Sequence, residues 1–284
     1  MTAEKPCLAP RTREEIGRKA GSPVSAPEVP QGNGLSMNLF VVVLARDRSH
    51  VEEKAAELER LGLPFTAVCG ERLNHPRVVY REPRGKWDAI NFARRLVPKD
   101  ADVVVLNDVD TRIHNFWHAL SHLHSADLVY CRVEVSGGPQ VKFYRIADPI
   151  RRRLHVFASG ELMLMKREVF ERVLPVPPTI AEDTYILFKA LELGYKAHFC
   201  TKTYTTTRRT ASAKEEEAYK ARTTLGIYQA LRHTRPPPWT RAFYALLPLA
   251  TPLLALAGED GRAWAKGIVK ALSMTIAGHN PARF

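Results

Sequence analysis

Short apolar runs alternate with helical patterns along the middle of the chain, from Met37 onward. The run LFVVVLA (39–45) is followed by a helical pattern that ends near Gly62, and then by the run FTAVCG (65–70). A helical segment at 86–97 precedes a further run, ADVVVLN. Strands that alternate with helices predict an α/β fold with a mainly parallel sheet covered on both faces. In such sheets ligands bind at the carboxyl ends of the strands.

The same pattern continues with a helix in NFWHALSHLH, a strand at 127–135 and a helix that begins at TIAEDTY. Three parts are expected. Residues 1–36 are rich in Pro, Gly, Ser and Ala and are predicted to be a disordered tail, so either Met1 or Met37 can be the true start. Residues 37–235 are expected to form the domain that carries any catalytic site, and residues 236–284, which open with three prolines, are expected to form a C-terminal helical segment.

The charge of the chain is unevenly distributed. Residues 201–241 carry 9 Lys and Arg against 3 Glu, which is half of the net charge of +12. An excess of this kind favours an anionic partner such as nucleic acid, a membrane surface or a phosphorylated ligand. The four cysteines are widely spaced and include no C-x-x-C pair. They indicate a reducing, cytoplasmic setting and suggest neither a disulfide framework nor a zinc site.

Two carboxylates follow the apolar run at 101–107. Asp108 and Asp110 stand two residues apart, and on an extended backbone such side chains point to the same side unless the chain turns between them. Like charges this close need a cation, and a divalent ion with oxygen ligands suits them. The alternative is a pair of loop aspartates that cap a helix beginning near His114.

Two other segments carry groups that suit a phosphorylated ligand. REPRGKWDAIN places Arg84, Gly85 and Lys86 at the start of a helix, where backbone N–H groups and cations can bind a pyrophosphate. A plain basic helix start is the alternative. TIAEDTYILF places Glu182 and Asp183 in the first turn of another helix. They can act as caps, or one can serve as a general base.

Three histidines offer a competing metal site. His114, His118 and His122 are spaced four residues apart in a predicted helix, which is a spacing that can bind zinc. Trp117 and Leu120 alternate with them, so a helix with polar and packed histidines is favoured over a zinc site.

Four segments, in this order, resemble the inverting glycosyltransferases of family 2, which use the GT-A fold. They are RGKWDAINFA, NDVDT as the D-x-D, SGELMLMKREVF, and AEDTYILFKALELGYKAHF as the E-D element. The resemblance covers roughly residues 38–230. It implies a hexosyltransferase that binds a UDP- or GDP-sugar donor together with Mn²⁺ or Mg²⁺.

The resemblance also implies roles for particular residues. Asp108 and Asp110 would bind the metal, Asp183 would deprotonate the acceptor and Glu182 would position it. The residues that would bind the nucleotide sugar are Ala45, Arg46, Glu71, Gly85, Lys86, Asn91, Asp108, Gly160 and Arg222.

The chain departs from the family in three segments. The first strand ends in LARDRS without the usual proline and asparagine, and Glu71 replaces an expected aspartate, which puts the nucleobase contacts in question. The Q-x-x-R-W signature of processive synthases is reduced to YKARTTLG, so a non-processive enzyme is expected. The basic residues Arg208, Arg209, Lys220 and Arg222 form either a clamp for a diphosphate or anionic lipid, or a solvated basic face.

The C-terminal segment suggests a membrane. Residues 242–258 contain no charged residue but include two prolines, and 17 residues are marginal for a span. Residues 262–278 are amphipathic and carry Lys266 and Lys270. These features predict a protein anchored to, or lying on, the inner face of the cell membrane, with a lipid-linked or glycan acceptor. The alternative is that both helices pack on the catalytic domain.

Two other functions compete with this interpretation. A sugar-phosphate nucleotidyltransferase would carry a glycine-rich first loop, whereas VVVLARDRSH has no glycine. A basic nucleic-acid-binding module would explain the charge, but the sequence shows no helix-turn-helix, zinc finger or RNA-binding aromatic motif. No nucleic-acid partner is therefore expected.

Overall fold

The computed structural model describes residues 37–278, and the predicted tail at 1–36 lies outside them. Within this part of the chain, eight strands form one sheet in the order β3-β2-β1-β4-β7-β6-β8-β5. The strands are β1 (Leu39–Ala45), β2 (Phe65–Cys69), β3 (Val78–Tyr80), β4 (Val103–Asp108), β5 (Arg112–His114), β6 (Leu128–Val135), β7 (Leu162–Lys166) and β8 (Ala197–Thr207). Neighbours from β3 to β4 are parallel, as are β6 and β8. The mainly parallel sheet is therefore confirmed.

Two strands run against this direction. β7 lies between β4 and β6 and is antiparallel to both, and β5 is antiparallel to β8 at the edge of the sheet. Neither of these two strands was predicted from the sequence. β7 begins where β4 ends, because Leu162 pairs with Asn107.

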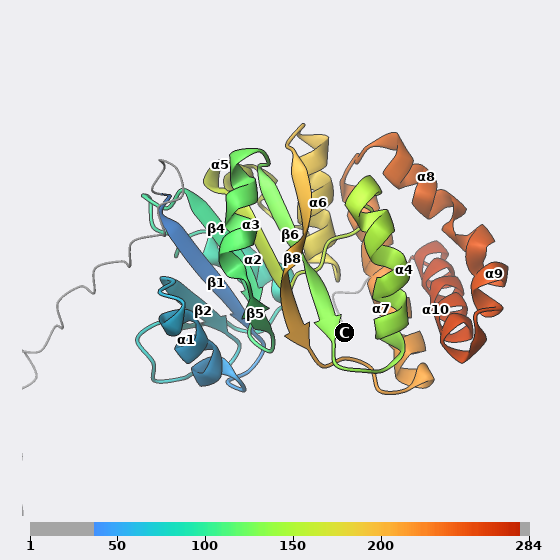
Figure 1. Ribbon diagram of the computed structural model, residues 1–284, viewed down its shortest axis with the longest axis horizontal. Coiled ribbons are helices and arrows are strands. Elements are labelled where there is room, and N and C mark those ends of the chain that lie inside the picture. The colour runs from blue at the N-terminus through green and yellow to red at the C-terminus, as the bar shows by residue number, and fades with distance from the viewer. Residues whose placement is uncertain (1–36, 279–284) are drawn as a thin grey trace, which may run out of the picture.

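Helices cover both faces of the sheet, and a further group of helices lies beyond one end of it. They are α1 (Val51–Arg60), α2 (Lys86–Ala93), α3 (Phe116–Ser121), α4 (Pro139–Leu154), α5 (Arg167–Val173), α6 (Glu182–Glu192), α7 (Ala213–His233), α8 (Pro238–Leu246), α9 (Thr251–Ala255) and α10 (Gly258–Ile276), with 3₁₀ turns η1 (His122–His124) and η2 (Leu247–Ala250). Figure 1 shows α8, α9 and α10 gathered beside α7 and α4, at the opposite end of the molecule from α1 and β2.

The apolar run of β1 is buried on both faces, as a continuous run predicts. Successive side chains of a strand point to opposite faces, so Val42 and Leu44 join the core under α2, α5 and α6. Val41 and Val43 join the core under α1 and α3. None of these four side chains is more than 6% exposed.

The segment after β4 rules out one alternative and corrects one prediction. α3 begins at Phe116, and its N-cap is Asn115, a residue with left-handed backbone (φ 56°) and no side-chain cap. Asp108 and Asp110 therefore do not cap this helix. His114 lies on β5 and stacks on Tyr204 with ring centroids 4.6 Å apart, so it does not share a helix with the other two histidines.

The C-terminal segment packs on the protein. Within residues 37–278, no helix is long and apolar enough to cross a membrane. The apolar face of α10 is covered by α7, which it approaches closely at Gly267, where an added Cβ would lie 2.8 Å from the Glu217 carbonyl oxygen. Trp264 of α10 donates to buried Glu216 of α7 at 3.0 Å. Exposed leucines of this segment gather on α8, η2 and α9, while α10 itself still exposes Val269 and Ile276.

Candidate active site

A cleft of about 1620 Å³ opens where β1, β2 and β4 end. Its other walls come from the starts of α2 and α6, from the segment before β7, and from α4, α7 and α10. These boundaries agree with the rule that ligands bind at the carboxyl ends of parallel strands. The predicted site residues that line it are Ala45, Arg46, Glu71, Gly85, Lys86, Asp108, Asp110, Gly160, Glu182, Asp183 and Arg222.

Lys86 stands at the centre of an acidic cluster. Its Nζ lies 2.7 Å from Asp108 Oδ1 and 3.0 Å from Glu182 Oε1. Lys86 is the first residue of α2, and Gly85 before it has φ 125°, a backbone conformation that a side chain would strain. The helix start therefore fixes the direction in which the lysine side chain enters the cleft.

Burial and charge set the ionisation of this cluster. Burial raises the pKa of Asp108, Glu182 and Asp183, and the Lys86 ammonium only partly opposes that rise. Burial lowers the pKa of Lys86, but the three carboxylates outweigh it and raise that pKa overall. Lys86 therefore stays cationic, while the carboxylates bind protons more readily than in water.

Asp183 lies against a glycine. A Cβ added to Gly160 would meet Asp183 Oδ2 at 3.2 Å and Lys86 Nζ at 2.7 Å, so position 160 has no room for a side chain unless its neighbours move. Asp183 Oδ1 accepts from the Thr184 backbone N–H at 2.6 Å, which orients the carboxylate. A carboxylate whose pKa is raised and which lines the cleft suits the role of a general base.

Asp110 is placed differently from Asp108. β4 ends at Asp108, and the chain turns before Asp110, which is exposed. The chain therefore turns between the two carboxylates, which is the exception that the sequence left open, and both line the cleft. The turn is held from α1, because buried Lys54 donates to the Thr111 carbonyl and Glu57 accepts from the Ile113 N–H at 2.7 Å. Sequence reasoning missed this support.

A second ion pair closes another side of the cleft. Arg209 pairs with buried Glu161 and also donates to the Tyr219 hydroxyl. Glu161 was not predicted, although it stands directly after Gly160 in the segment that resembles the family. The Arg209 side chain is thus held by Glu161 and Tyr219, while the side chains of Arg208 and Arg222 are exposed at the cleft.

Lys220 is buried in the same cleft. Its Nζ lies 3.1 Å from the centroid of the Phe143 ring. Burial lowers the pKa of Lys220 to about 7, and Glu216 opposes the shift. The basic residues thus differ in their exposure to solvent. Arg208 and Arg222 are solvated, as the alternative from the sequence has it, whereas Lys220 is buried.

Asn91 does not line the cleft. Its side-chain amide donates to the Val176 carbonyl at 2.8 Å and accepts from the Val176 N–H at 2.7 Å. It joins α2 to the loop before α6, so the prediction that it lies in the nucleotide-sugar cleft is wrong. Its contribution is to position these two segments.

The residues present fit a divalent cation of the Mg²⁺ or Mn²⁺ type. Asp108 and Asp110 offer carboxylate oxygens at the cleft, and within residues 37–278 no hydrogen bond or ion pair engages the Asp110 carboxylate. One or two protein carboxylates, with substrate phosphates and water, form the usual Mg²⁺ environment. The two carboxylates would therefore hold the cation only together with a phosphorylated ligand, which would supply the remaining oxygen ligands.

The fold resembles that of known glycosyltransferases. The structure of GalNAc-T7 with UDP, GalNAc and Mn²⁺ matches with a TM-score of 0.51 and 14% sequence identity, over 87% of this chain and 58% of that chain. The structure of M. tuberculosis glucosyl-3-phosphoglycerate synthase gives a TM-score of 0.47 and 16% identity, over 71% and 82%. No family model matches the chain, and no curated protein matches it in sequence. The first of these similarities shows a GT-A type fold and assigns no particular family.

Proposed function

We propose that the protein is a metal-dependent, inverting and non-processive glycosyltransferase of the family 2 type, which moves a hexose from a UDP- or GDP-sugar to a hydroxyl or phosphate acceptor. The observation that carries the proposal is the cluster of Asp108, Glu182 and Asp183 around Lys86, in a cleft at the carboxyl end of β4. The GT-A type fold supports it.

The donor is assigned to the side of the cleft near β1 and β2. Ala45, Arg46 and Glu71 would contact the nucleoside, and the N-terminus of α2 at Gly85 would face the diphosphate. Asp108 and Asp110 would hold Mn²⁺ or Mg²⁺, which supplies positive charge beside the departing diphosphate. Arg222 would contribute a second cation from α7.

The acceptor is assigned to the side near α6. Asp183 would take the proton of the attacking hydroxyl, and its raised pKa suits it to that role. Gly160 lets Asp183 and Lys86 lie close to the backbone, and Glu182, held by Lys86, would position the acceptor. A single displacement with a base needs no covalent nucleophile, and it inverts the anomeric carbon.

A thermal-shift panel tests the donor site. UDP, GDP, CDP and ADP are each added with and without Mn²⁺, and we expect one nucleotide to stabilise the protein only when the metal is present. At 100 times the Kd, a ligand adds about 2.7 kcal/mol. A domain of this size gains about 2–4 °C in Tm per kcal/mol, so the shift should be roughly 5–10 °C.

The matched variants are Asp110→Asn and Asp100→Asn. Asp110 lines the cleft, and its substitution should abolish the metal-dependent shift. Asp100 is an exposed aspartate before β4 that does not line the cleft, so its variant should behave as the wild type does. The proposal fails if no nucleotide stabilises the wild-type protein under any metal condition.

We further propose that the acceptor is presented at the inner face of the cell membrane. Four leucines are strongly exposed: Leu246 on α8 (60%), Leu249 on η2 (73%), Leu253 on α9 (72%) and Leu256 directly after α9 (82%). Other residues of the same segment, Leu247, Ala250 and Leu254, line the cleft. The segment from α8 to α9 thus exposes leucines on its outer side and lines the cleft on its inner side, an arrangement that suits a lipid-linked acceptor.

Flotation with anionic phospholipid vesicles tests this surface. Burying one leucine side chain is worth about 1.5–3 kcal/mol, so Leu253→Glu and Leu256→Glu should each weaken binding by about tenfold or more. The control is Val141→Glu, which changes an exposed apolar residue on α4. Equal binding by all three variants would exclude α9 as the membrane contact.

A further inference from the structure

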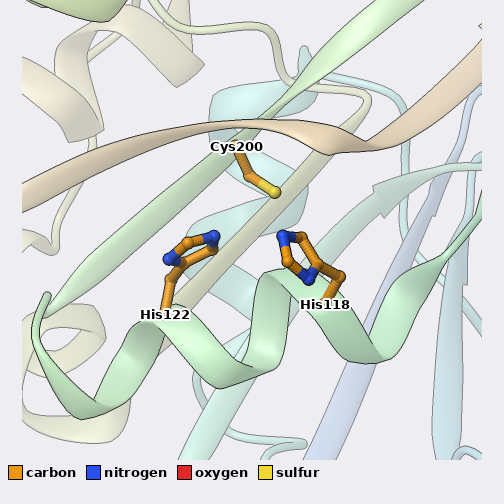
Figure 2. A group of neighbouring side chains, drawn as sticks. All are labelled: His118, His122 and Cys200. Atoms are coloured by element: carbon orange, nitrogen blue, oxygen red, sulfur yellow. The ribbon is translucent and has the colours of Figure 1, made fainter.

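Two histidines and a cysteine converge between α3 and β8. A ring nitrogen of His118, a ring nitrogen of His122 and the Sγ of Cys200 all lie within 4.8 Å of one another. Figure 2 shows both imidazole rings rising from the helix toward the cysteine on the strand that crosses above them. None of the three residues lines the cleft, so this cluster is separate from the candidate active site.

We propose that His118, His122 and Cys200 form a binding site for Zn²⁺ that ties α3 to β8. Zinc binds imidazole nitrogen at about 2.0–2.1 Å and thiolate sulfur at about 2.3 Å, so the ligand atoms of a tetrahedral site of this composition stand roughly 3.3–3.6 Å apart. Ligand atoms within 4.8 Å can reach that spacing by small side-chain rotations. A thiolate with two imidazoles prefers zinc to the hard cations that carboxylates bind.

The sequence supplies the two histidines at the spacing that a helix needs. His118 and His122 are four residues apart, which puts both rings on one face at the end of α3. The third ligand comes from a distant strand, and the earlier candidate His114 is excluded because it lies on β5. Two of the three histidines considered from the sequence thus belong to the proposed site, and the third does not.

The surroundings orient Cys200 and His122. Cys200 is 1% exposed, and its Sγ accepts from the Thr203 backbone N–H at 3.4 Å. The Thr203 hydroxyl donates to the Asn115 carbonyl at 2.7 Å, at the start of α3. The His122 ring stacks on His198 with centroids 3.9 Å apart. Such outer partners hold metal ligands in place, and both histidines are half-buried, which leaves water access to a fourth position.

The position of the site gives it a structural role. β8 continues past Cys200 to Thr207, and the chain then supplies Arg208 and Arg209 to the cleft. A metal that fixes β8 to α3 would therefore hold the strand that leads into the active site. This inference does not depend on the proposed function, since its ligands and its chemistry are different.

Cobalt provides the direct test. The full chain is stripped of metal with a chelator and titrated with Co²⁺, which gives a thiolate-to-metal charge-transfer band only when a cysteine is bound. We expect one Co²⁺ per chain with this band and with tetrahedral d–d absorption, both removed by Zn²⁺. Cys200→Ser should lose the band. His118→Asn should weaken Zn²⁺ affinity by at least about 100-fold, since loss of an outer partner alone costs about 10–100-fold.

Two controls share the chemistry but not the site. His124→Asn changes an exposed histidine of η1, and Cys69→Ser changes a buried cysteine at the cleft; both should keep the band. His118 is only half-buried, so His118→Asn should fold even if Cys200→Ser does not, which circular dichroism of the metal-free variants checks. The inference is overturned if the folded wild-type protein shows no thiolate band, or if Cys200→Ser or His118→Asn binds Zn²⁺ as the wild type does.

Discussion

Replacing Lys86 with methionine should destabilise the protein in a way that depends on pH. The substitution keeps the length of the side chain and removes the cation that lies 2.7 Å from Asp108 and 3.0 Å from Glu182. Removing one partner of a buried ion pair costs about 3–5 kcal/mol. The Lys86 side chain is 29% exposed and the remaining carboxylates can take up protons, so we expect about 2 kcal/mol at pH 8. That is roughly 4–8 °C in Tm.

The loss should be smaller at pH 5. Burial raises the pKa of Asp108, Glu182 and Asp183, and the loss of Lys86 raises it further, so part of the cluster is protonated and neutral at lower pH. Calorimetry at pH 5 and pH 8 measures both effects.

Arg84→Met is the matched control for this experiment. Arg84 is two residues away and pairs with Glu82, but both side chains are more than 60% exposed, so the cost should stay below about 1 kcal/mol. Equal losses for Lys86→Met and Arg84→Met, or a Lys86→Met loss that does not change with pH, would refute the assignment of Lys86 as the cation of a buried acidic cluster.

Two other substitutions test neighbouring contacts. Burial raises the folded-state pKa of Glu182, so its ionised form is less stable in the folded than in the unfolded protein, and Glu182→Gln should raise Tm at pH 8. That gain should fade as the pH falls to the ordinary glutamate pKa of 4.5, which a Tm-against-pH series measures, and a gain that is constant with pH would contradict it. Gly160→Ala places a methyl group against Lys86 and Asp183, so it should cost about 1–3 kcal/mol and reduce sugar transfer more than nucleotide binding, unlike a substitution that merely unfolds the protein.

The central part of the fold is predictable because its strands are buried on both faces. The runs that become β1, β2 and β4 are nearly continuous in apolar residues, which few other structures tolerate. The rule about carboxyl ends then places Asp108 and Gly85 at one cleft without any knowledge of contacts. α7 was not predicted, because only part of its surface is buried and its charged residues conceal the apolar pattern.

Pairings between distant residues could not be predicted in this way. Lys54 and Glu57 look like an ordinary surface pair on a helix, and only the folded chain shows that they hold the turn after β4. Cys200 likewise looks like a small apolar residue of a strand. Its proximity to His118 follows from the packing of α3 on β8, which the sequence of neither element specifies.

The direction of β7 explains why Glu161 was missed and why it lies where it does. A parallel strand next to β4 would have its first residues at the far edge of the sheet from the cleft. β7 is antiparallel, so its start at Leu162 pairs with Asn107, and the two residues before it, Gly160 and Glu161, lie beside Asp108. One edge of the sheet thus gathers the carboxyl end of β4 and the amino end of β7. That arrangement brings the backbone of Gly160 next to the carboxylates of the cleft. A parallel strand in the place of β7 would have put this glycine at the other edge of the sheet.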